Sequence, residues 1–180
     1  MMDLTAETTA LIEDNHVIDD VEKEYFSHVK KVNDIFYDQI KISDQKAAYI
    51  FTFLIAFIVS SSDGRDVFSP GRYLTGTIFM NISSALLAGS SLAALICAIM
   101  VVLPRSMGRS TTLFWGSWPR HRPLLLKAVK ASDSNYLFNQ YLENADILSD
   151  IARRKYKFVS ISFKCLFLTL ISYVLVLMTK

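Results

Sequence analysis

The side chains with the clearest chemical capacity form a basic cluster made of Arg153, Arg154, Lys155, Lys157, Arg105 and Arg109. Guanidinium groups form paired hydrogen bonds with phosphate oxygens, and lysine adds a mobile point charge. The cluster is therefore a candidate binding site for a phosphate-bearing ligand. The alternative is topological, because basic residues beside a membrane also hold its orientation and contact anionic lipid.

A second pattern is a series of small and polar side chains in the apolar segment 78–103. Asn81, Ala85, Gly89, Ala93 and Cys97 recur every four residues, and serines repeat beside them at intervals of seven. Small residues let transmembrane helices approach closely and hydroxyls bond across helices, so the pattern is compatible with packing alone. In the other interpretation, this face lines a water path in a ring of subunits, which apolar side chains close by dewetting. The residues predicted to line such a pore are Asn81, Ser84, Ser91, Leu87 and Phe53.

The residue types on which enzymes depend form no recognisable set. The three histidines lack metal-ligand spacing, and the six glycines are scattered rather than gathered in a phosphate-binding loop. Cys97 and Cys165 lie within apolar runs, which is typical of small buried hydrophobic residues. We expect no catalytic residue, no metal site and no cofactor, and we predict that the chain is not an enzyme.

The composition indicates an integral membrane protein, because 52% of the 180 residues are hydrophobic and the mean hydropathy is +0.30. Three runs predict transmembrane helices, at 47–62, 78–103 and 158–178. The first, with 16 residues, reaches only roughly 24 Å across a hydrocarbon core of roughly 30 Å. Local thinning or packing within an oligomer accommodates such a span. In the third run, Lys164 is expected to reach the interface along its own stem, and the alternative is a role in a pore.

The distribution of charge predicts the orientation. Segment 104–157 carries 10 Lys and Arg against 4 Asp and Glu, so this basic loop and helix is expected in the cytoplasm. The short segment 63–77 then lies outside as an external loop, and with three spans the N-terminus is cytoplasmic. If 47–62 does not cross, the N-terminal arm lies outside instead. The acidic start of the chain makes a cleaved signal peptide unexpected.

Two water-exposed segments are predicted to be helices. The arm 1–46 holds 11 Asp and Glu against 5 Lys, and its apolar residues fall on one helical stripe from Val17 to Ile40. No Pro or Gly interrupts the chain before Asp63, so the arm is expected to continue into the first span as one helix. A second stripe runs from Leu137 to Ala152, after a cap at Ser132 or Asp133. A stripe this narrow needs a partner helix, which predicts a homo-oligomeric bundle. The alternative is that each helix lies on the membrane surface.

The segment between the second span and the second stripe is rich in Pro and Gly, from Pro104 to Pro123, and is predicted to be a loop. Its two tryptophans, Trp115 and Trp118, lie near basic residues, as is typical of a membrane interface.

Four short motifs together resemble the Pycsar effector transmembrane domain. They are Asp44-Gln45-Lys46-Ala47 at the first span, Leu103-Pro104-Arg105 after the second, Phe114-Trp115-Gly116 in the loop, and the run 147–156 before the last helix. The resemblance covers about residues 15–178. It implies an all-α membrane effector of bacterial antiphage defence in the inner membrane, acting by abortive infection and controlled by a nucleotidyltransferase or cyclase encoded nearby.

The chain lacks room for the separate cyclic-nucleotide-binding domain common in that family, and in this respect it resembles the small effector of the Hailong defence system. There a DNA oligomer made by the partner transferase holds the effector shut. The ligand implied is thus a single-stranded DNA oligomer or a cyclic nucleotide. The predicted function is an ion channel built from several copies, a tetramer or similar, in the lipid bilayer. Alternatives are a non-conducting scaffold that recruits a cytosolic partner, and a holin-like lesion former that needs no ligand.

Overall fold

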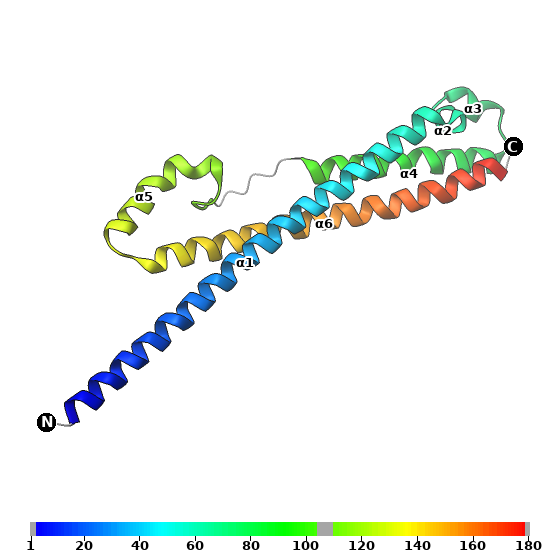
Figure 1. The fold of residues 1–180 in the computed structure, drawn as a ribbon. Coiled ribbons are helices and arrows are strands. Elements are labelled where there is room, and N and C mark those ends of the chain that lie inside the picture. Colours follow the sequence, from blue (N-terminus) through cyan, green and yellow to red (C-terminus); the bar gives the residue numbers. More distant parts are fainter. Residues whose placement is uncertain (1–2, 104–109, 179–180) are drawn as a thin grey trace. The chain divides into compact units, whose positions relative to one another are not determined.

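A computed structural model of the chain describes the backbone of residues 3–103 and 110–178, and the side chains from residue 21 onward except those of 75 and 134. All regular elements in these ranges are helical (Figure 1). They are α1 (Asp3–Ser60), α2 (Ser62–Asp66), α3 (Pro70–Thr75), α4 (Ile78–Val102), the short 3-10 helix η1 (Trp115–Ser117), α5 (Trp118–Lys130) and α6 (Ser134–Met178).

Three of these helices, α1, α4 and α6, are long and apolar enough to cross a membrane. They cover the three runs that the sequence predicted as spans to within two residues, so the predicted fold class of an all-α membrane protein with three transmembrane helices is confirmed. Helix α1 ends at Ser60, two residues before the predicted end of the first span, whereas at the predicted start the helix continues into the arm.

The arms continue into the spans without a break. Helix α1 has 58 residues and α6 has 45, which at 1.5 Å per residue gives lengths of about 87 and 68 Å. The absence of Pro and Gly explains the length of α1. The start of α6 is capped by Asp133, whose carboxylate accepts a hydrogen bond from the Tyr136 N–H at 3.2 Å.

The chain divides into two compact units, which are described separately below. The arm unit comprises residues 1–37 and 107–149, and the span unit comprises residues 38–106 and 150–180. Helices α1 and α6 each contribute to both units.

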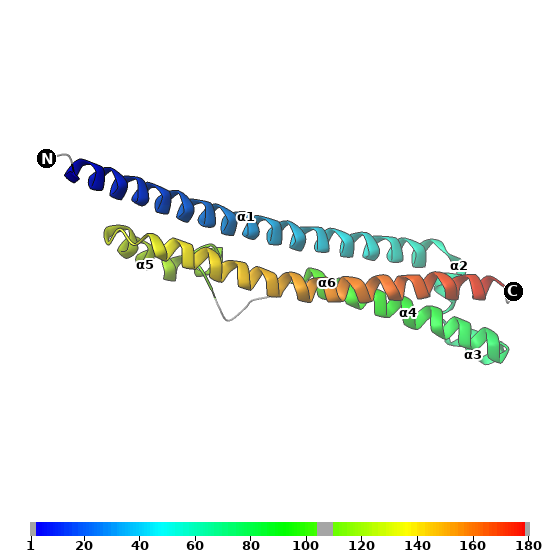
Figure 2. The same ribbon diagram turned by 90° about the horizontal axis from the view of Figure 1, so that it is seen from below.

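The span unit is a three-helix bundle of α1, α4 and α6, which lie side by side in both views (Figures 1 and 2). Its core consists of three apolar layers along the bundle, one around Ala47 and Ala98, one around Leu54 and Ala94, and one around Leu87 and Val176. Alanine in two of the layers lets the helix backbones approach closely.

The connector between α1 and α4, predicted as a simple external loop, is itself folded. It contains α2 and α3, and its Val67 is 2% exposed in the layer with Leu87. The Tyr73 hydroxyl donates to the Val67 carbonyl at 2.6 Å, which ties the two short helices together.

The prediction of a loop after α4 is partly wrong. Residues 118–130 form α5, although they include two prolines. Pro119 lies in the first turn, where its missing N–H has no partner inside the helix, so it starts the helix rather than breaking it. Pro123 removes one backbone hydrogen bond further along. Trp115 is 85% exposed in η1, ahead of this helix.

Candidate functional site

The interior of the span unit contains many hydroxyls beside its apolar side chains. Ser84, Ser91, Ser162 and Ser172 are at most 1% exposed, and Ser90 is 5% exposed. Two hydrogen bonds cross between α4 and α6, from Ser162 to the Ala94 carbonyl at 2.8 Å and from Thr169 to Ser90 at 3.0 Å. The remaining hydroxyls include Ser91 and Ser172, which donate to carbonyls of their own helices. Hydroxyls satisfied in this way join helices within a membrane.

A buried ion pair lies at the end of the bundle formed by the connector. The side chains of Arg72 and Asp63 are 9% and 7% exposed, and their charged atoms are 4.0 Å apart. The Arg72 Nε also donates to the Ser84 hydroxyl at 2.8 Å, so the guanidinium joins the connector to α4. Nearby, the Asn81 amide donates to the carbonyls of Tyr73 and Gly76. Buried charges are costly unless they are paired, so this pair is a candidate site in its own right.

A second ion pair lies at the opposite end of the bundle. The Lys155 ammonium donates to the Asp44 carboxylate at 2.5 Å, and the Lys155 side chain is only 8% exposed. In the same region the Tyr156 hydroxyl donates to Gln39, and the Lys46 ammonium lies 5.6 Å from the centre of the Tyr156 ring. Helices α1 and α6 are therefore held together here by polar contacts that involve the Asp44-Gln45-Lys46-Ala47 motif.

In the arm unit, a chain of amides connects α1, α6 and the segment before η1. Asn33, which is 6% exposed, donates to the Tyr141 carbonyl at 2.9 Å and accepts from the Asn144 amide at 2.7 Å. Asn144 in turn accepts from the fully buried Thr111 hydroxyl at 2.9 Å. Each buried polar group has a partner on another element, which fixes the register of the three segments.

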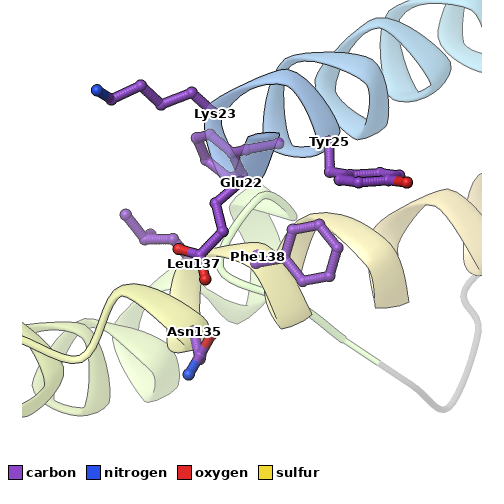
Figure 3. A pocket seen from close by; sticks show the side chains of 7 residues that line it. Glu22, Lys23, Tyr25, Asn135, Leu137 and Phe138 are labelled. Atoms are coloured by element: carbon purple, nitrogen blue, oxygen red, sulfur yellow. The ribbon is translucent and has the colours of Figure 1, made fainter. Parts of the chain in front are cut away.

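Farther along the arm unit, α1 and α6 enclose an open pocket of about 430 Å³ (Figure 3). Phe138 lies on the α6 side, and Glu22 points from α1 toward α6. Next to the pocket, Phe26 packs edge-to-face against Tyr141 with ring centres 5.4 Å apart. The pocket lining is Glu22, Lys23, Tyr25, Phe26, Asn135, Leu137 and Phe138.

The family model of the Pycsar effector protein domain matches residues 28–180. The chain belongs to the Pycsar effector family. It is therefore a membrane effector of the kind that acts in antiphage defence, and the resemblance inferred from the four motifs is confirmed. No curated protein and no solved structure matches the chain.

In this Pycsar effector, the basic cluster is divided by the fold. Arg153, Arg154 and Lys157 are exposed, and Arg153 forms a 2.6 Å ion pair with Asp150. Lys155 points inward to Asp44, so its charge is already neutralised. The other two members, Arg105 and Arg109, lie outside the described residues. A ligand role for the cluster stays a prediction, and the three exposed cations are the ones positioned to meet a ligand.

The five residues predicted to line a pore lie in different environments. Ser84, Leu87 and Ser91 lie in the interior of the bundle, at most 1% exposed, and the Asn81 amide is bonded to the connector. Phe53 is 47% exposed and stacks on Phe57 with ring centres 6.5 Å apart. Within one protomer the first three are packing positions, and the pore role of all five stays a prediction.

Two groups were missed by the sequence interpretation. Arg72 was counted only as a loop charge, and the link from Asn33 through Asn144 to Thr111 was not recognised. Pairing over 111 residues leaves no local signal, since the partner of Asn33 is set by how α1 meets α6. A signal did exist for Arg72, because an arginine close to an apolar span needs a counter-charge and the connector before it contains two acids, Asp63 and Asp66.

Proposed function

We propose that this chain is a homo-oligomeric ion channel of the bacterial inner membrane, controlled by a nucleotide ligand, whose opening ends a phage infection together with the infected cell. The single observation that carries the proposal is the family match over residues 28–180, which coincides with three helices of spanning length. In this proposal a nucleotidyltransferase or cyclase encoded nearby makes the ligand, a single-stranded DNA oligomer or a cyclic nucleotide.

The charge distribution supports an orientation with the N-terminus in the cytoplasm. Ten basic residues between 104 and 157 belong on the cytoplasmic side, which places the connector between α1 and α4 outside. The Asp63–Arg72 pair would then close the outer end of each bundle, and the Lys155–Asp44 pair the inner end.

The outward surface of α4 supports assembly from several copies. Ala85 and Gly89 are exposed on this helix, and no atom lies within 4 Å of the position of a Cβ on Gly89. Small exposed residues on a membrane helix let a second helix approach closely. The polar stripe of α4 meanwhile faces inward, so a conducting path lined by Ser84 and Ser91 requires the protomer bundle to loosen. We therefore assign the described arrangement to the closed state.

The cytoplasmic cations support a polyanionic ligand. Arg153, Arg154 and Lys157 are exposed on α6 immediately before its apolar part, so a bound polyphosphate would act directly on a pore helix. Neutralising phosphates gives affinity that does not depend on base sequence and falls as salt is raised.

Reconstitution into liposomes with a trapped fluorescent dye for K⁺ tests the proposal. We expect ion flux that changes on addition of short single-stranded DNA or a cyclic nucleotide. The double variant Arg153→Glu, Arg154→Glu should lose this response while staying oligomeric, and Lys127→Glu on α5 is the matched control. Unchanged ligand binding by the double variant would remove the basic cluster from the site. A silent bilayer under all conditions would favour the scaffold, and toxicity without any partner gene would favour the ligand-independent lesion former.

A further inference from the structure

We propose that the arm-unit pocket between α1 and α6 binds a nucleobase, with the attached phosphate held by the adjoining lysines of α1. This rests on the nucleotide control proposed above and gives it a second contact site, separate in the chain from the basic cluster. The proposal assigns both the base and its attached phosphate to the arm unit.

The first support is the aromatic lining. Tyr25 is 65% exposed although it is aromatic, and Phe26 and Phe138 are half-buried with part of each ring open to the pocket. Aromatic rings offer stacking faces that bind bases in single-stranded nucleic acids. The volume of about 430 Å³ falls within the range of about 300–1,000 Å³ that is usual for small-molecule sites.

The second support is a basic hollow of about 360 Å³ that shares Lys23 and Phe26 with the pocket. It also contains Ser27, Lys30 and Lys31, so three ammonium groups and a hydroxyl lie on one face of α1. The Lys30 ammonium is 5.6 Å from the centre of the Phe26 ring and 6.0 Å from that of Tyr141. An aromatic pocket adjoining a lysine-lined hollow matches a ligand with a planar base at one end and an anion at the other.

The acidic residues determine which way round the ligand binds and which bases are preferred. Glu22 lines the aromatic pocket and points toward α6, so it repels phosphate there (Figure 3). As a carboxylate it only accepts hydrogen bonds, which favours bases with an exocyclic amino group, such as adenine and cytosine, over thymine. Asp34 also lines the basic hollow and repels an anion that approaches it along α1.

The position of the pocket relative to the family match distinguishes it from sites common to the whole family. Residues Glu22 to Phe26 precede residue 28, where the match to the family model begins, whereas Asn135 to Phe138 fall within it. The pocket therefore combines a helix of the family domain with a segment outside the matched region, so it belongs to this chain rather than to the domain.

Binding of fluorescently labelled oligo(dA), oligo(dC) and oligo(dT) to the full-length protein in nanodiscs tests the proposal, with labelled cyclic AMP as a second probe. We expect oligo(dA) or oligo(dC) to bind more tightly than oligo(dT). Phe138→Leu keeps an apolar side chain of similar volume but removes the stacking face. It should weaken binding about 5- to 150-fold, the equivalent of one base stack. Phe114→Leu, in the same unit but away from the pocket, is the matched control. Lys31→Gln should weaken binding and reduce its salt dependence, whereas Lys127→Gln should not.

Photocrosslinking with oligo(dA) that carries 8-azidoadenine locates the base directly. Adducts on peptides that contain Tyr25, Phe26 or Phe138 support the pocket. Two results overturn the assignment of the base to this pocket and leave nucleotide control intact. One is tight binding that is equal in Phe138→Leu and Phe114→Leu, and the other is adducts confined to residues 153–157. Wild-type protein that binds none of the probes overturns both proposals. Crosslinks between protomers through Phe138 that the oligonucleotides do not displace assign the pocket to a second copy of the chain instead.

Discussion

Asn144 is the central member of the amide chain in the arm unit, and its replacement by leucine gives a sharp prediction. The substitution removes two hydrogen bonds, the one to the side-chain amide oxygen of Asn33 at 2.7 Å and the one from the Thr111 hydroxyl at 2.9 Å. Asn33 and Thr111 are 6% and 0% exposed, so water does not easily replace the lost partner. A buried polar group left unsatisfied costs about 1–3 kcal/mol. The Thr111 hydroxyl can rotate to another acceptor and therefore contributes less than Asn33, so the arm unit should lose about 3 kcal/mol of stability in total.

Hydrogen exchange of the full-length protein measures this loss as local opening of the arm unit. At 1.4 kcal/mol per factor of ten, a loss of about 3 kcal/mol raises amide exchange roughly a hundred-fold in peptides from residues 21–37 and 110–117. Peptides from α4 should be unchanged. Asn139→Leu, an exposed position on the same helix, should leave all of these rates within a few fold.

The double variant Asn33→Leu, Asn144→Leu separates the hydrogen bond from the packing. Replacing both partners by apolar groups is close to neutral for that pair, so the double variant should cost about 1–2 kcal/mol less than the sum of the two single variants. Exchange in Asn144→Leu equal to that in Asn139→Leu, or strictly additive effects in the cycle, would refute the reasoning.

Variants at three positions test the span unit, with thermal unfolding in detergent and the oligomeric state as measurements. Arg72→Met removes the cation that faces the buried Asp63 carboxylate, together with the hydrogen bond to Ser84. It should cost about 3–5 kcal/mol, seen as a lower Tm than that of the exposed control Arg65→Met, and equal Tm values would contradict the buried pair. Gly76→Ala puts a Cβ in collision with the side-chain amide oxygen of Asn81, so it should cost about 1–3 kcal/mol through the lost hydrogen bonds of that amide. The added methyl group of Gly89→Ala meets no atom within 4 Å apart from its own helix backbone, so this variant should stabilise the protomer by up to about 1 kcal/mol. Gly89→Leu should lower the fraction of oligomer. An unchanged oligomer fraction would exclude this face of α4 from the interface between protomers.

The sequence predicted the helices well because they depend on local signals. The three apolar runs, the lack of Pro and Gly before Asp63, and the cap at Asp133 act within a few residues, and each appears in the structure as expected. Helix α5 was missed for a local reason too, since Pro119 was taken as a breaker although proline is favoured in a first turn.

The candidate sites were predicted less well because they depend on tertiary contacts. The sequence alone gives no way to know that Lys155 faces Asp44 while its neighbours Arg153 and Arg154 face solvent. The regular spacing of Ser84 and Ser91 placed them on one face of α4, but periodicity does not say whether that face meets the same protomer or a pore.

Within the span unit, the uninterrupted backbone of α1 fixes the direction of the Asp44 carboxylate relative to the apolar layers. Each residue of an α-helix turns the chain by 100° and advances it by 1.5 Å, so one residue inserted between Asp44 and Ala47 would rotate Asp44 by that angle against Ala47 and Leu54. Point substitutions in this stretch are therefore tolerable where insertions and deletions are not. Variants of one and seven added residues would reveal this, because only the longer insertion returns Asp44 close to its original bearing.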